Sequence, residues 1–179
     1  DVDVTLYSLR KWTTLACKGN PTALHFLFAK DLLRNPIWAS VIGRQDSFLS
    51  RTCAKHFMGF ANDQLARVSG KRGRGQKGQR PQLEQKYGYD VKAATHAIRL
   101  LGECKEILLS GTITLPRPEC DLLIRVRTGK FSLERVLNMA TKLFAGCEAA
   151  TEKSVLPEKV DRHAVSEVLS HAYLRAWKI

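Results

Sequence analysis

Apolar side chains recur every three or four positions along most of the chain, the spacing that is typical of amphipathic helices. Several of these stretches follow a polar residue whose side-chain oxygen is a good N-cap, and Gly19 follows the first of them, where a left-handed residue ends a helix. The pattern predicts helices that start after the N-cap residues Ser8, Asn20, Asp90 and Ser132, and two further helices over Asp46–Val68 and Asp161–Trp177.

The first six residues follow another pattern, in which polar and apolar side chains alternate. Asp1 and Asp3 would share one face of a strand, with apolar side chains on the other. Ile113 and Leu115 indicate a second short strand or extended segment, whereas the apolar run Leu122–Val126 is too short to assign. The sequence therefore predicts an α+β fold that is mainly α, with a short N-terminal strand and a helical C-terminal portion.

The chain of 179 residues is 44% hydrophobic and 26% charged, values that exclude wholesale disorder. This length suits one domain, or one domain with an added lobe, and allows roughly 70% of the unfolded surface to be buried. No apolar run approaches the roughly 18 residues that cross a bilayer, so no membrane span is expected. The five cysteines are odd in number, lie far apart and form no CxxC pair, which favours reduced thiols and a cytoplasmic protein.

Lysine and arginine outnumber the acids by 29 to 17, and the formal net charge is +12. Half of this excess lies in and beside a glycine-rich stretch at 70–80 that has no apolar side chain, and a mobile loop is predicted over 69–81. Such a loop attracts nucleic acid with little sequence preference, although a solvated loop that binds nothing has the same composition. The candidate nucleic-acid-binding residues are Arg67, Lys71, Arg72, Arg74, Lys77 and Arg80.

The loop also contains a literal GxGxxG pattern from Gly73 to Gly78. Dinucleotide binding is excluded, because no strand precedes the pattern and the next helix starts too late. A phosphate-binding loop of the Walker A type is excluded as well, since no GK[ST] follows the glycines.

A second cationic feature lies on the predicted helix after Asp90. Lys92, His96 and Arg99 stand at positions i, i+4 and i+7, so they share one helix face within about 11 Å of axial rise. We expect no acid on this stripe, so a triphosphate or a nucleic-acid phosphate would relieve the repulsion among the three groups. The alternative is a solvated basic face with a satisfied histidine.

Asp1 and Asp3 stand two apart on the predicted strand, an arrangement that can hold a divalent metal ion. A solvated edge strand has the same pattern. Because the chain opens on Asp1 rather than methionine, and already inside a predicted strand, we expect it to be the later part of a longer polypeptide.

Several stretches together resemble one protein family. VDVTLYSLRKW and CKGNPTALHFLF resemble the strand, helix and Gly-Asn-Pro turn of predicted nucleotidyltransferases in the RNA-repair-pathway branch of the DNA polymerase beta superfamily. KYGYDVKAATHAIRLLGECKEILLSGTITLP is similar to the Lys-x-x-x-His-x-x-Arg-Leu helix of that family. IRVRTGKFSLERV resembles its Ile-Arg-x-Gly segment, and SVLPEKVD resembles its Leu-Pro-x-x-x-Asp ending. The resemblance covers nearly the whole chain.

The resemblance implies transfer of a nucleoside monophosphate from a nucleoside triphosphate to a hydroxyl acceptor, with RNA as the expected acceptor and two Mg²⁺ ions as the cofactor. It implies that Asp3 binds metal and accepts the proton of the attacking hydroxyl, with Asp1 as the second choice. The Gly-Ser turn and Asp-x-Asp strand that carry the other two carboxylates would lie upstream, which would leave this chain alone nearly inactive. Alternatively, Asp1-Val2-Asp3 is itself the metal pair.

The resemblance also implies roles for the cationic helix face. Lys92, His96 and Arg99 would neutralise the triphosphate or the acceptor backbone, and Tyr89, together with Tyr87, would stack on a base. It further implies that residues 1–36 end a nucleotidyltransferase core and that residues 37–179 form a helical, substrate-facing domain.

Two other classes of protein fit the same residues. A non-catalytic basic helical module would bind nucleic acid or a protein assembly, and a Gly-Ser turn with Asp-x-Asp upstream would argue against it. A nucleotide-sensing regulator would bind triphosphate without turnover, and calorimetry with ATP and GTP, alongside product analysis, would identify it.

Overall fold

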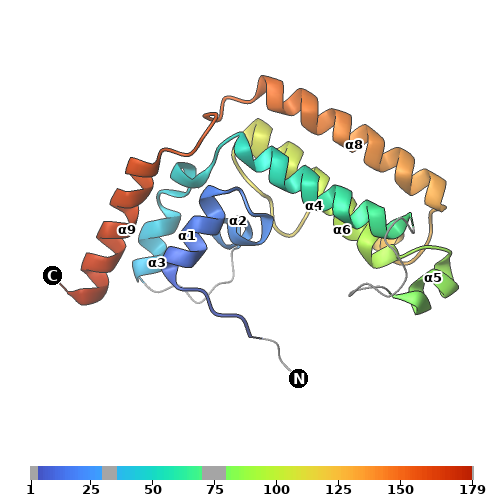
Figure 1. Ribbon diagram of the computed structural model, residues 1–179, viewed down its shortest axis with the longest axis horizontal. Coiled ribbons are helices and arrows are strands. Elements are labelled where there is room, and N and C mark those ends of the chain that lie inside the picture. The colour runs from blue at the N-terminus through green and yellow to red at the C-terminus, as the bar shows by residue number, and fades with distance from the viewer. Residues whose placement is uncertain (1–3, 30–35, 70–79, 179) are drawn as a thin grey trace. The chain divides into compact units, whose positions relative to one another are not determined.

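The computed structural model describes residues 4–29, 36–69 and 80–178 (Figure 1). Within these ranges every regular element is a helix and no strand is present. The chain divides into two compact units: unit 1 comprises Asp1–His56 and Leu156–Ile179, and unit 2 comprises Phe57–Val155. These are units of packing, and the functional division into residues 1–36 and 37–179 stays a prediction.

Trp12, a buried residue of the first helix, is the centre of unit 1. Its indole Nε1 donates a hydrogen bond to the carbonyl oxygen of Ala23 at 3.0 Å. The ring meets the edge of Trp38 with centroids 4.8 Å apart, and it lies tilted against Phe48 at 5.1 Å. One aromatic side chain therefore holds four elements together. The elements of unit 1 are α1 (Leu9–Cys17), α2 (Pro21–Phe28), α3 (Pro36–Ile42), the 3₁₀ helix η1 (Gln45–Phe48), the start of α4 (Thr52–Val68), and α9 (Arg162–Trp177).

Helix α6 (Val91–Ser110) is the centre of unit 2 and packs against α7 (Cys120–Arg127) and α8 (Leu133–Lys153). Figure 1 shows α8 alongside α6. More than one stripe of α6 is buried, as expected for a helix with neighbours on several sides. An apolar cluster near the start of α6 includes Tyr89, Phe131 and Val136. The other elements of unit 2 are the rest of α4, α5 (Pro81–Tyr87), α7 (Cys120–Arg127) and α8 (Leu133–Lys153).

The N-caps predicted from the sequence are confirmed. The side chains of Ser8, Asn20, Asp90 and Ser132 each accept a hydrogen bond from a backbone N–H in the first turn of the helix that follows. Gly111 ends α6 in the left-handed conformation, with φ of 66°. Caps are predictable because donor and acceptor lie within a few residues of each other.

The predicted N-terminal strand is wrong, and with it the α+β fold class. Val4 and Leu6, the part of that segment within the described ranges, belong to no regular element and are 73% and 90% exposed. A strand needs a partner whose backbone bonds to its own, and no described residue supplies one. The fold of the described residues is therefore all-α.

The helix predicted over Asp46–Val68 is interrupted. Its first residues lie in η1, Leu49 is extended with φ of −99° and ψ of 137°, and α4 begins only at Thr52. The N–H of Arg51 donates to the carbonyl oxygen of Pro157 at 2.8 Å. The carbonyl oxygen that accepts from Arg51 therefore belongs to a distant segment and not to the preceding helical turn. A local pattern of apolar residues cannot predict such a partner.

Two shorter assignments also change. Ile113 is buried and Leu115 half-buried, and neither belongs to a strand. Of the two alternatives predicted there, the short strand is therefore wrong. The unassigned run Leu122–Val126 lies inside α7.

Gly19 lets the turn between α1 and α2 approach the start of α4 closely. Its φ is +73°, and a Cβ built on it would lie 2.5 Å from the Cα of Cys53. A side chain at this position would meet both a strained backbone and the backbone of another helix. Glycine is therefore required for this contact within unit 1.

Replacing Gly19 by alanine should destabilise the protein by about 2–4 kcal/mol, the sum of left-handed strain and overpacking. Urea unfolding followed by circular dichroism measures the change. The matched control is Gly59→Ala in α4, where a new Cβ meets nothing within 4 Å and should stabilise the helix by about 0.5–1 kcal/mol. Equal stabilities of the two variants would contradict the assigned contact.

A small ion-pair network in unit 2 holds the loop after α6. The Arg117 guanidinium donates to the carboxylates of Glu106 and Glu119, and Thr114 donates to Glu106 through its hydroxyl at 2.5 Å and its N–H at 3.1 Å. Burial raises the pKa of Glu106, but the hydrogen bonds from Thr114 and Arg117 outweigh it, and the pKa lies below its usual range. The ionised form of Glu106 thus stabilises the fold.

Glu106→Gln should lower the free energy of unfolding at pH 7 by about 1–3 kcal/mol, because a charged hydrogen-bond acceptor is lost. The wild-type advantage is present above the unfolded pKa of about 4.3 and disappears as the pH falls through the lower folded value. Urea unfolding from pH 7 to pH 3 tests this. The control Glu152→Gln, at an exposed position of α8, should stay within about 0.5 kcal/mol of wild type throughout. If the difference in unfolding free energy between Glu106→Gln and wild type stayed constant from pH 7 to pH 3, the assigned role of the ionised Glu106 would be contradicted.

Candidate functional site

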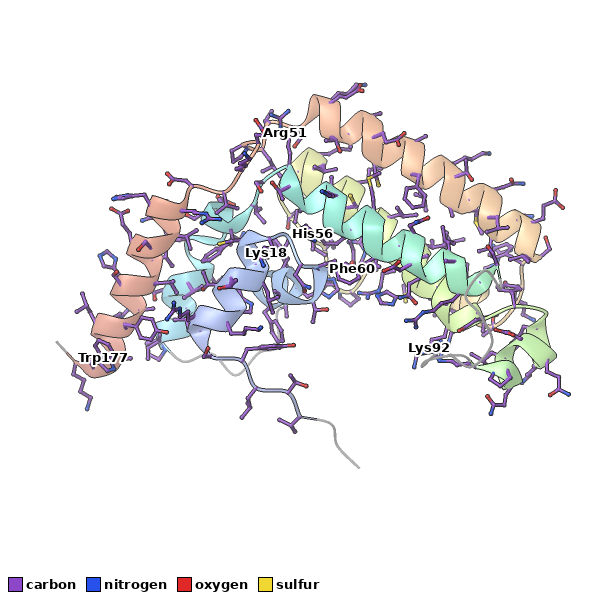
Figure 2. All side chains as sticks on the ribbon, viewed as in Figure 1. Lys18, Arg51, His56, Phe60, Lys92 and Trp177 are labelled. Carbon is purple, nitrogen blue, oxygen red and sulfur yellow. The ribbon has the colours of Figure 1, made fainter. Side chains whose placement is uncertain are left out.

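Helix α6 carries the predicted cationic face. Lys92 is exposed in its first turn (Figure 2), and His96 and Arg99 follow half-buried at i+4 and i+7. The three residues therefore lie on one face of one helix, as their spacing predicted. The two groups farther along the helix are partly withdrawn from solvent, so Lys92 is the most exposed of the three.

The expectation that no acid lies on this stripe is wrong. Glu103, one turn beyond Arg99, is fully buried, and its Oε1 accepts a hydrogen bond from Arg99 Nη1 at 3.0 Å. A buried carboxylate needs such a partner, because desolvation of an isolated charge is costly. Arg99 therefore carries a structural charge pair in addition to any role toward a ligand.

Asp90 already satisfies the N-terminal backbone of α6. Its Oδ1 accepts from the N–H groups of Lys92 and Ala93, both at 3.0 Å, and its Oδ2 accepts from Arg80 Nη1 at 2.9 Å. A phosphate near the start of α6 would thus be bound by side chains rather than by these two N–H groups. Arg80, a predicted nucleic-acid contact, ties the end of the basic segment to this cap.

Tyr89 has a packing role. It is 3% exposed, and its hydroxyl donates to the carbonyl oxygen of Phe131 at 2.9 Å. Burial raises the pKa of Tyr89. Its ring therefore offers no open face to a base. Tyr87 is half-buried beside Gly129, where an added Cβ would lie 2.4 Å from the Tyr87 ring.

The remaining predicted residues divide by position. Arg67 is half-buried in α4, and its Nε is buried without a hydrogen-bond partner among the described residues. The other loop cations and both N-terminal carboxylates lie outside the described residues: Lys71, Arg72, Arg74, Lys77, Asp1 and Asp3.

A cavity of about 620 Å³ within unit 1 was not predicted from the sequence. Lys18, Lys159 and Arg162 line it together with His56, and Lys18 and His56 are marked in Figure 2. These residues come from the C-cap of α1, from the segment before α9, from α9 itself and from α4. The cavity thus gathers cations that are far apart in the sequence.

Two hydrogen bonds bring the segment before α9 to this cavity. Besides the bond from Arg51 to Pro157, the hydroxyl of Thr52 donates to the carbonyl oxygen of Glu158 at 2.9 Å. Lys159 follows directly. In the sequence, the stretches with Lys18 and Lys159 stood out only because both resemble motifs of one family. The spacing of apolar residues does not indicate that these stretches contact the same cavity.

The described residues contain no group of three or more histidine, cysteine, aspartate or glutamate side chains that could hold a metal ion. Within the same residues, no helix is both long enough and apolar enough to pass through a membrane.

The model of the RlaP family, described as the RNA repair pathway DNA polymerase beta family, matches residues 1–172. The chain belongs to this family. No curated protein and no solved structure matches the chain significantly. The resemblance read from the sequence motifs is thereby confirmed, and membership of the family supports a theme of nucleotidyl transfer and RNA repair.

Replacing Arg99 by methionine should destabilise unit 2 by roughly 3 kcal/mol, because the buried Glu103 carboxylate loses its ion-pair partner. Lys92→Gln, at an exposed position of the same face, should change the stability by less than about 0.5 kcal/mol. Urea unfolding measures both. The double variant R99M/E103M should recover part of the loss, since both charges are then removed. If R99M had the same stability as wild type, the ion pair between Arg99 and Glu103 would make no net contribution to the stability of the fold.

Proposed function

We propose that this chain is part of a nucleotidyltransferase that transfers a nucleoside monophosphate from a nucleoside triphosphate to a hydroxyl of RNA and releases pyrophosphate. The family match over residues 1–172 carries the proposal, because the description of the family names both a DNA polymerase and RNA repair. A polymerase joins a nucleotide to a hydroxyl, and the repair context favours RNA as the acceptor. The net charge of +12 supports a polyanionic partner.

The chemistry assigned to helix α6 is neutralisation of phosphate charge. Lys92 is the residue we assign to this role, since it is exposed at the start of the helix. A positioned cation stabilises the negative charge that builds on phosphate oxygens during transfer. The charge of Arg99 is partly balanced by Glu103, so its proposed contribution to the positive field is smaller than that of Lys92. His96 lies between them on the same face and is the third residue of the proposed set.

Mg²⁺ is the cofactor of the proposal, and Asp3, with Asp1 as the second choice, is its proposed ligand. When bound, such an ion stabilises charge on the reacting oxygens. The requirement for Mg²⁺ stays a prediction, as do a nucleoside triphosphate and RNA as partners. The chain's own residues are proposed to bind and orient the phosphates.

The test is transfer of label from α-³²P nucleoside triphosphates to RNA with a free 3′ hydroxyl, using the full-length protein with Mg²⁺. We expect labelled RNA and released pyrophosphate, and no product when a chelator removes the metal. Lys92→Gln should lower kcat/KM by an amount equivalent to about 2–4 kcal/mol.

Asp3→Asn should reduce turnover more than about 100-fold if Asp3 binds metal. The control Asp121→Asn alters an exposed carboxylate of α7 and should retain activity. Absence of label with every triphosphate and acceptor, combined with retained RNA binding, would instead favour the non-catalytic basic module. Binding of ATP or GTP without product would favour a nucleotide sensor.

A further inference from the structure

We propose that the cavity in unit 1 is a binding site for the phosphate groups of a nucleotide. Three exposed basic side chains line it, namely Lys18, Lys159 and Arg162, and the half-buried His56 adds a fourth nitrogen donor. No carboxylate is among the described residues that line the cavity. Cations that gather without a counter-charge repel one another, and a multiply charged anion relieves that repulsion.

The nearest acids in the sequence do not neutralise this lining. Asp161 caps α9, where its Oδ1 accepts from the N–H of His163 at 2.8 Å and of Ala164 at 3.3 Å. Glu158 is exposed, and it is bound through its carbonyl oxygen rather than its carboxylate. Neither carboxylate is among the described residues that line the cavity, so the charged groups of the lining itself are basic.

A threonine on the cavity wall strengthens the case for a polar ligand. Thr13 is 6% exposed, and its Oγ1 is buried without a hydrogen-bond partner among the described residues. A buried hydroxyl without a partner is costly and rare. A phosphate oxygen accepts hydrogen bonds and would supply the missing partner.

The size of the cavity favours a nucleotide over a bare phosphate ion. About 620 Å³ lies within the range of pockets that hold organic ligands, and Val160 and Val165 give it apolar wall as well. Phosphates would contact the cations, and the sugar or base would contact the apolar part. The cationic site rests on the cavity alone, whereas the choice of a nucleotide among phosphorylated ligands rests on the proposed function.

Binding is measured by titration calorimetry with tripolyphosphate, ATP and a 5′-phosphorylated oligoribonucleotide at one salt concentration. The variant K159Q/R162Q removes two cavity cations, and the control K55Q/R175Q removes two exposed cations of α4 and α9 outside the lining. We expect the cavity variant to bind tripolyphosphate at least about tenfold more weakly, since each charged hydrogen bond is strong. The control, with the same net charge, should bind nearly as wild type does.

The three ligands identify the source of the phosphate. Tightest binding of ATP supports a free nucleotide, and tightest binding of the 5′-phosphorylated strand, with a loss on dephosphorylation, supports a nucleic-acid end. If tripolyphosphate bound equally weakly to K159Q/R162Q and K55Q/R175Q, the loss would reflect net charge alone, and the proposal would be overturned. Absence of tripolyphosphate binding by wild type would overturn it as well.

Cys17 on the cavity wall gives a second measurement that needs no variant. Burial raises the pKa of the Cys17 thiol, and the positive charge of Arg162 acts in the opposite direction. A bound anion would cover the thiol and offset Arg162, so tripolyphosphate should slow alkylation of Cys17. Cys120, exposed in unit 2, is the internal control and should react at an unchanged rate. Equal rates for Cys17 with and without tripolyphosphate would contradict the site.

The two proposals fail separately. Protection of Cys17 and weakened binding in K159Q/R162Q, without any nucleotidyl transfer by the full-length protein, would retain the cavity site and reject the proposed function. Transfer by the wild type, with tripolyphosphate binding unaffected in K159Q/R162Q, would reject the cavity site alone.

Discussion

The close approach of Gly19 to Cys53 is the constraint on which unit 1 depends. With φ of +73° and no Cβ, Gly19 lets the turn after α1 lie against the backbone at the start of α4. Lys18 precedes that turn, and Thr52 and His56 lie on the facing part of α4, so the same contact places all three on one cavity. Backbone packing thus comes first, and the chemistry of the cavity follows from it.

The two cationic regions differ in how their charge is balanced. On α6, the buried Glu103 binds Arg99, so part of the positive charge is compensated within the helix. In the unit 1 cavity, Lys159 and Arg162 line a space without a lining carboxylate among the described residues. The pair on α6 compensates the buried carboxylate of Glu103, so α6 holds its arrangement without a ligand. The cavity cations Lys18, Lys159 and Arg162 are exposed, so they attract an anion from solvent through their combined positive field.

Sequence patterns predicted the features that are settled locally. The cap of α6 at Asp90 follows from chemistry within one turn and was predicted correctly. The predicted strand and the predicted unbroken helix through Leu49 are wrong because both outcomes depend on distant backbone partners. No described residue pairs with the N-terminal segment, and the carbonyl oxygen of Pro157 accepts from Arg51 at the break in the helix. Glu103, the counter-charge of Arg99, stands four residues after it. This i, i+4 spacing on a helix predicts an ion pair, so the acid on the stripe could have been found from the sequence.

The cavity shows why its residues could not be found by spacing. Lys18 belongs to the stretch that resembles the Gly-Asn-Pro turn of the family, and Lys159 belongs to the stretch that resembles its Leu-Pro-x-x-x-Asp ending. The bond from Thr52 to the Glu158 carbonyl joins the second stretch to the start of α4, and the contact of Gly19 with Cys53 brings the first stretch to the same part of α4. In that ending, Asp161 caps α9 and so fixes where the helix begins. The cap therefore sets the direction of Arg162, the first residue of α9, and a motif that looks purely structural also places a charge on the cavity wall.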